Sequence, residues 1–96
     1  MRPLGTDLGD PEVRPWFLWD EDLTVAALRG ILADPDHPRW TEIASKVMRE
    51  ARDDEVWTFL TPRVVATRYS AIAPRLGRRR AFWDYLLDAW KRHGLL

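Results

Sequence analysis

Residues 40–51 read WTEIASKVMREA and contain the clearest helical pattern in the chain. Apolar residues recur there at i, i+3, i+4, i+7, i+8 and i+11, which is one stripe of a helix with about 3.6 residues per turn. The stripe consists of Trp40, Ile43, Ala44, Val47, Met48 and Ala51. Charged residues fill the opposite side, where Glu42 precedes Lys46 by one turn in the favourable order. The stretch therefore predicts an amphipathic helix whose apolar stripe is buried.

Shorter helical patterns lie on both sides of this stretch. One helix is expected over residues 23–33, where Val25 and Leu28 would point inward. After a short helix over 53–60, Thr61 and Pro62 form an N-cap and a first helical residue for a helix over 62–73. A last helix is expected over 78–93. No strand-length alternation is present, so we predict an all-α fold, a single compact bundle of four to five short helices with an extended N-terminal arm.

The N-terminal residues 1–15 are rich in proline and glycine, which interrupt regular elements. We expect an extended or mobile arm over 1–15 and a helical domain over 16–96. The apolar run of residues 16–19, WFLW, would dock against the core at the entry to the first helix. The three carboxylates of residues 20–22 are N-cap candidates for that helix.

The last expected helix is apolar over most of its girth. Its polar positions, Asp84, Asp88 and Lys91, form one narrow stripe, and apolar residues flank the stripe on both sides. Such a helix is central to its bundle or presents a second face to a partner. Periodicity predicts that Trp40, Trp57, Phe82 and Leu86 belong to the core. The other tryptophans, Trp16, Trp19, Trp83 and Trp90, include the candidates for exposure to a partner.

The sequence predicts no enzyme. It contains no cysteine and no phosphate-loop, dinucleotide-binding, zinc-protease or serine-hydrolase motif. His37 and His93 lie in a proline-rich loop and at a helix end, without evident partners. We therefore expect no catalytic residue, no metal, no cofactor and no small-molecule substrate. No apolar run approaches the about 20 residues that span a bilayer, and the N-terminus is unlike a signal peptide. A cytoplasmic protein without membrane contact is the expectation.

Charge is distributed unevenly along the chain, although the formal net charge is zero. Residues 1–38 hold 3 basic and 8 acidic side chains, and residues 39–96 hold 12 basic and 7 acidic. Two explanations stay open: a basic face that meets an anionic partner, or two halves that neutralise each other within the fold. Acidic side chains at residues 20, 22 and 34 are the candidates for that neutralisation.

The arginines before the last helix are the most informative polar feature. Arg78, Arg79 and Arg80 follow Arg75 and would oppose the helix dipole, so local helix stability does not require them. Arginine binds phosphate and carboxylate groups in a bidentate manner, which predicts an anion- or partner-binding patch. With Trp83 and Trp90 these four arginines form the candidate site. The alternative is a solvated turn that pairs within the fold.

A weaker helix-turn-helix pattern covers residues 53–73. Its second helix would present Arg63, Thr67 and Arg68 outward, and these residue types could contact nucleic acid. The turn carries Thr61 and Pro62 rather than the usual small residue and glycine. These three residues are the alternative, nucleic-acid-binding site.

Three segments together resemble a known type of protein. They are FLWD at residues 17–20, VWTFLTP at 56–62 and LGRRRAFW at 76–83. The pattern is similar to small helical bacterial proteins of unknown function that are encoded beside nucleotidyltransferases of the abortive-infection E type. This resemblance implies an accessory or antitoxin-like subunit of a toxin–antitoxin or phage-defence locus, and it assigns no individual site residue.

Two functions are carried forward from the sequence. The first is a non-catalytic protein-interaction module that binds a protein partner or forms a homo-oligomer. The second is a small nucleic-acid-binding regulator that uses the arginine cluster. The two differ in their response to salt, because phosphate contacts make affinity fall steeply as salt rises.

Overall fold

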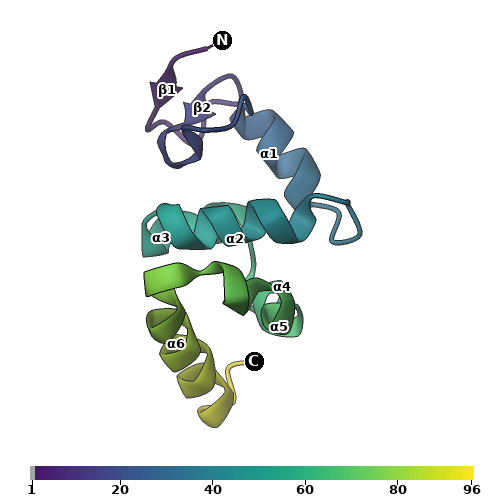
Figure 1. The fold of residues 1–96 in the computed structure, drawn as a ribbon, viewed down its shortest axis with the longest axis vertical. Coiled ribbons are helices and arrows are strands. Elements are labelled where there is room, and N and C mark those ends of the chain that lie inside the picture. The colour runs from purple at the N-terminus through teal and green to yellow at the C-terminus, as the bar shows by residue number, and fades with distance from the viewer. Residues whose placement is uncertain (1) are drawn as a thin grey trace.

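The computed structural model describes residues 2–96, in which six α-helices are joined by short turns (Figure 1). The helices are α1 (Val25–Leu32), α2 (Trp40–Glu50), α3 (Asp53–Phe59), α4 (Pro62–Thr67), α5 (Tyr69–Ile72) and α6 (Arg80–Arg92). Three 3-10 helices accompany them: η1 (Trp16–Leu18), η2 (Ala73–Arg75) and η3 (Gly77–Arg79). A two-stranded parallel sheet pairs β1 (Leu4–Gly5) with β2 (Arg14–Pro15). The fold is mostly helical, but the small sheet and the sixth helix depart from the predicted pure bundle of four to five helices.

Helix α2 lies at the centre of the molecule. It contacts α1, α3 and α5 and also the three 3-10 helices. In Figure 1 the N-terminal elements and α1 lie on one side of α2, and α4, α5 and α6 lie on the other. The molecule is elongated along this direction, with principal extents of 43 × 24 × 22 Å. The predicted apolar stripe of α2 is fully buried, so the central helix was predicted correctly.

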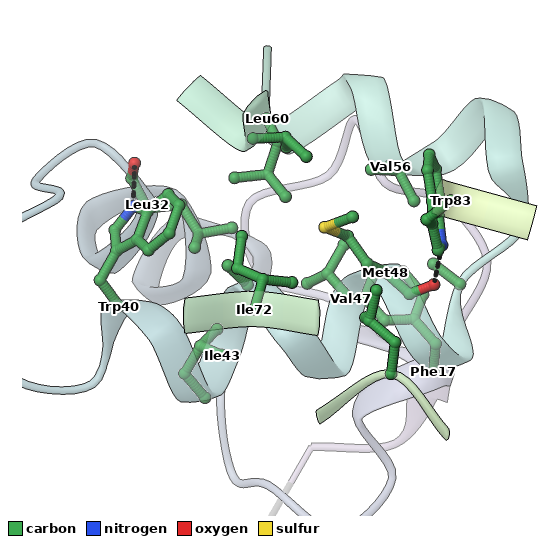
Figure 2. Packing of buried hydrophobic residues seen from close by; sticks show 14 of the residues in the cluster. Phe17, Leu32, Trp40, Ile43, Val47, Met48, Val56, Leu60, Ile72 and Trp83 are labelled. Atoms are coloured by element: carbon green, nitrogen blue, oxygen red, sulfur yellow. Dashed lines mark hydrogen bonds between the residues drawn. The ribbon is translucent and has the colours of Figure 1, made fainter. Parts of the chain in front are cut away.

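Two buried tryptophans anchor the ends of α2. The indole N–H of Trp40 donates to the carbonyl of Leu32, at 3.1 Å, and that of Trp83 donates to the carbonyl of Met48, at 3.0 Å. Figure 2 shows these two indoles at opposite ends of this part of the core, with Ile72 and Met48 between them. A buried indole needs such an acceptor, because an unpaired polar group inside the protein is costly. The first bond ties the start of α2 to the end of α1, and the second ties α6 to the end of α2.

The acidic residues before α1 do not cap it. Thr24 is the N-cap instead, and its hydroxyl accepts from the backbone N–H of Ala27 at 3.2 Å. The carboxylate of Glu21 accepts from Lys46 at 2.7 Å and from Arg39 at 2.8 Å. Asp20 also pairs with Lys46. The capping prediction was wrong because Lys46 of α2 and Arg39, the N-cap of α2, lie opposite these carboxylates.

The predicted helix over 62–73 is divided in two. Thr61 and Pro62 begin α4 as predicted, with the Thr61 hydroxyl accepting from Val64. The chain leaves helical geometry at Arg68, where φ is −110° and ψ is 14°, and resumes as α5. The Arg68 guanidinium donates to the carbonyl of Pro35 at 2.9 Å and lies over the Trp40 ring. The partners lie 33 and 28 residues before Arg68 in the chain, so local sequence gives no sign of the break.

The N-terminal residues are attached to the domain by hydrogen bonds. Backbone N–H groups of Val25 and Ala26 donate to the carbonyls of Val13 and Pro11, at 2.8 and 3.1 Å. The buried Arg14 guanidinium donates to the carbonyls of Arg2 and Glu21, at 2.8 and 3.0 Å. This N-terminal segment is therefore joined to the start of α1, and its own strands β1 and β2 pair with each other. Among residues 2–96, no helix has the length and apolar character to cross a membrane.

Candidate interaction surface

Helix α6 has one apolar face turned toward the core. Trp83 is completely buried, Leu87 is buried one turn later, and Trp90 is partly buried. The Trp57 ring of α3 lies between the two tryptophans, with centroid distances of 5.6 Å to Trp83 and 5.5 Å to Trp90. Aromatic contacts of this kind hold α6 to the rest of the molecule. Of the predicted partner-binding tryptophans, Trp83 is therefore inside the protein and Trp90 is largely covered by Trp57.

A second apolar face of α6 is turned toward solvent. Phe82 is 38% exposed and Tyr85 is 69% exposed, while Ala89 is half-buried. The spacing i, i+3, i+7 places these three side chains on one side of the helix. Arg78 precedes Phe82 by four residues, and Arg92 follows Ala89 by three. We call these five residues, Arg78, Phe82, Tyr85, Ala89 and Arg92, the α6 outer face.

The prediction that Phe82 belongs to the core was wrong, and that for Leu86 and Trp57 holds only in part. Leu86 and Trp57 are half-buried and pack against the core, whereas Phe82 lies outside it. Because apolar residues surround α6 on most sides, periodicity permits more than one inward face. The structure selects the face of Trp83. The exposure of Tyr85 was missed, because apolar residues on most sides of α6 leave its outward face undetermined by the sequence.

The three consecutive arginines have different surroundings. Arg79 turns inward, where its guanidinium donates to the carbonyl of Ala51 at 2.6 Å and to the carboxylate of Asp53. It also lies 5.6 Å from the ring centroid of Phe82 and 5.7 Å from that of Trp83. These contacts tie the start of α6 to the junction of α2 and α3. Arg79 is thus occupied within the fold.

Arg80 has an ion pair within its own helix, whereas Arg75 and Arg78 have none within residues 2–96. The Arg80 guanidinium lies 3.7 Å from the carboxylate of Asp84, one turn later. Within residues 2–96, the exposed side chains of Arg75 and Arg78 have neither an ion pair nor a hydrogen bond. The predicted acidic partners for this cluster lie elsewhere: Asp20 pairs with Lys46, Asp22 lies 3.8 Å from Arg14, and Asp34 accepts from the backbone N–H of Asp36.

Asp84 has a second partner in α5. It accepts the Tyr69 hydroxyl at 2.6 Å. Burial raises the pKa of Tyr69 above its ordinary value, and the hydrogen bond to Asp84 raises it further. The phenol therefore stays protonated and keeps donating to Asp84 at neutral pH. This contact positions α6 on α5 and engages the carboxylate that lies closest to Arg80.

Of the three residues predicted for nucleic-acid binding, Arg63 and Thr67 are exposed and Arg68 is half-buried. Arg63 is exposed and has no ion pair within the described chain. Thr67 is exposed, but its hydroxyl donates to the carbonyl of Arg63 at 2.8 Å. Arg68 is held by Pro35, Trp40 and Asp36. With α4 only six residues long, Arg63 alone keeps a side chain that is free for contact.

The surface of residues 2–96 carries no pocket, and these residues bring together no group of three or more His, Asp or Glu side chains suited to a metal ion. The α6 outer face combines aromatic rings with arginines. Comparison of the chain with models of protein families, with curated proteins and with solved structures found no match. The candidate site is therefore defined by the geometry of α6.

Proposed function

We propose that this chain is a non-catalytic protein-interaction module that binds its partner through the α6 outer face. The observation that carries the proposal is the exposure of Phe82 and Tyr85 side by side on a helix whose opposite face is already buried. Most other exposed side chains of α6 are charged, so these two aromatic rings are the apolar part of its solvent-facing side. Aromatic and arginine side chains together are typical of interface hot spots.

The resemblance described above suggests which partner to test. It favours an accessory or antitoxin-like subunit of a toxin–antitoxin or phage-defence locus, and hence the protein encoded by the neighbouring gene. The non-catalytic part of the proposal rests on the sequence, which lacks the motifs of the common catalytic classes. Binding of nucleic acid by Arg63 and Arg78 is the competing function.

The first experiment is a light-scattering mass measurement on a sizing column, for the protein alone and mixed with the neighbouring gene product. We expect a stoichiometric complex that Tyr85→Ala weakens by at least about tenfold, as for a hot-spot residue. Trp19→Ala is the matched control, because Trp19 is 67% exposed but follows η1 on the other side of α2. Circular dichroism verifies that both variants fold.

Two outcomes would reject the proposal. In the first, the protein remains alone and monomeric with the neighbouring product present. In the second, the complex forms but Tyr85→Ala and Trp19→Ala weaken it equally. Binding of duplex DNA that weakens steeply with salt would instead favour the nucleic-acid function.

A further inference from the structure

The α6 outer face has a positive charge at each end. Arg78 lies one turn before Phe82, and Arg92 lies in the last turn of α6 beyond Ala89. With a helical rise of about 1.5 Å per residue, roughly 20 Å separates the two arginines along the helix. The apolar centre of the face, formed by Phe82, Tyr85 and Ala89, lies between them. An occupant that spans the whole face comes within reach of both charges.

The carboxylates of α6 leave the positive charge in excess. Asp84 is engaged by Arg80 and Tyr69, and Asp88 pairs with Arg92 at 3.1 Å. Arg78 and Lys91 have no acidic partner within residues 2–96. The pair between Asp88 and Arg92 is open to solvent and contributes little stability, so Arg92 can exchange its partner. The charge pattern therefore favours a negatively charged occupant.

A second copy of this chain fits the pattern poorly. Antiparallel pairing of two α6 helices about Tyr85 would place Arg78 of one copy opposite Arg92 of the other. Parallel pairing would place each arginine opposite itself. Like charges at both ends of an interface are repulsive and exclude the wrong partner. The charges thus argue against self-association through this face.

We infer that the α6 outer face binds an acidic amphipathic helix of a protein partner. The inference rests on the proposed function and adds the chemistry of the partner to it. The partner helix presents apolar side chains at i, i+3 or i+4 and i+7 to Phe82, Tyr85 and Ala89. The small Ala89 side chain allows the two helices to approach closely. Carboxylates at the two ends of the partner helix pair with Arg78 and Arg92 in bidentate geometry.

The test uses two synthetic peptides of about 18 residues, long enough for the roughly 20 Å face. Both carry leucine at i, i+3, i+4 and i+7 positions, and they differ only in flanking glutamates or lysines. Fluorescence anisotropy measures binding to the full chain at low and high salt. We expect the glutamate peptide to bind at least about tenfold more tightly than the lysine peptide and to weaken as salt rises.

Two charge-reversal variants make the test specific. Arg78→Glu is expected to lower the affinity for the glutamate peptide at least about tenfold. Arg63→Glu is the matched control, because Arg63 is exposed and without an ion pair, but lies on α4; it should change binding by less than about twofold. Tyr85→Ala should weaken both peptides, since it removes the apolar centre.

Several results would overturn the inference. They are failure of the glutamate peptide to bind, equal binding of the two peptides, and equal effects of the two charge reversals. Dimerisation that Tyr85→Ala abolishes would assign the face to a second copy, and competition by single-stranded oligonucleotide would assign it to nucleic acid. In one further outcome, the neighbouring product forms a Tyr85-dependent complex although neither peptide binds. That result would keep the proposed interaction module and reject only the acidic character of the partner helix.

Discussion

At the scale of single residues, adjacent arginines have separate roles. Arg79 donates to Ala51 and Asp53 and covers Trp83, whereas Arg78 has no partner in residues 2–96. Arg79→Ala should lower the free energy of unfolding by about 1–3 kcal/mol, because it leaves a carbonyl and a carboxylate without their donor. Arg78→Ala should change it by less than about 0.5 kcal/mol, as at an ordinary surface position. Urea denaturation measures both values.

The two variants control each other, because they remove the same side chain from neighbouring positions. Equal effects on stability would contradict the assignment of Arg79 to the fold and Arg78 to the surface. If Arg78→Ala were the more destabilising, Arg78 would be engaged within the fold and not free for a partner. The comparison therefore bears on the α6 outer face as well as on stability.

The carboxylates near Lys46 make stability depend on pH. The hydrogen bond from Lys46 holds the pKa of Glu21 below its ordinary value of 4.5, and Arg39 lowers it further. The pKa of Asp20 is also lowered by Lys46. Burial alone would lower the pKa of Lys46, but its bonds to Glu21 and Asp20 raise it. At neutral pH both carboxylates and the Lys46 ammonium group are therefore charged, and the ion pairs are formed.

A carboxylate with a lowered pKa in the folded state stabilises above its unfolded pKa and loses this effect as pH falls through its folded pKa. The free energy of unfolding should therefore decrease as the pH drops below about 4.5. Glu21→Gln should destabilise by about 1–2 kcal/mol at neutral pH and converge with the parent in acid. Glu50→Gln, at an exposed ion pair, is the control. Thermal unfolding across pH measures the difference, and parallel curves would contradict the prediction.

At the scale of elements, two glycines have opposite requirements. Gly30 lies inside α1, and a Cβ atom there would meet nothing within 4 Å. Gly77 has a φ of +55° at the start of η3, which side-chain-bearing residues rarely adopt. Gly30→Ala should raise the free energy of unfolding by about 0.5–1 kcal/mol. Gly77→Ala should lower it by about 1–2 kcal/mol, measured by thermal unfolding. Stabilisation by both substitutions would show that the turn before α6 tolerates other backbone angles.

The elements that sequence predicts well are those with one clear face. The stripe of α2 and the start of α4 at Thr61 and Pro62 follow from local pattern alone. The break at Arg68 does not, and the Arg68 side chain is engaged there by Pro35 and Trp40, which lie far away in the sequence. The face of α6 was similarly undetermined: with apolar residues on most sides, only the tertiary contacts of Trp83 with Trp57 and Met48 show which face is inside. Sequence alone left open whether Arg78 pairs within the fold, and it did not predict the exposure of Tyr85.

At the scale of the whole molecule, α2 separates two differently charged parts. The acidic Asp20 and Glu21 are bound by Arg39 and Lys46 of the α2 region. They are consequently not available to the arginines near α6, on the other side of α2. Residues 1–38 and 39–96 neutralise each other in part, because Asp20 and Glu21 pair with cations of the α2 region and Asp36 pairs with Arg68. Because α2 intervenes, the basic excess stays on the α6 side and supports an anionic partner there.

The N-terminal segment provides the last prediction. Arg14 is buried, donates to the carbonyls of Arg2 and Glu21, and so ties residues before β2 to those after η1. Arg14→Met keeps the packing of the side chain but leaves these carbonyls without a donor. It should lower the free energy of unfolding by about 2–3 kcal/mol and accelerate hydrogen exchange at Val25 and Ala26, whose N–H groups bond to the segment.

The control for Arg14 is Arg2→Ala, which removes an exposed ion pair with Glu12 and should have little effect. Tryptophan emission and circular dichroism both follow unfolding in urea. If they report one and the same transition, and Arg14→Met shifts that whole transition, residues 2–15 unfold together with the helices. An unchanged main transition with faster exchange confined to Val25 and Ala26 would mean that the segment opens by itself. The helices would then form the stable unit without it, and α6 would keep its outer face regardless of the N-terminal residues.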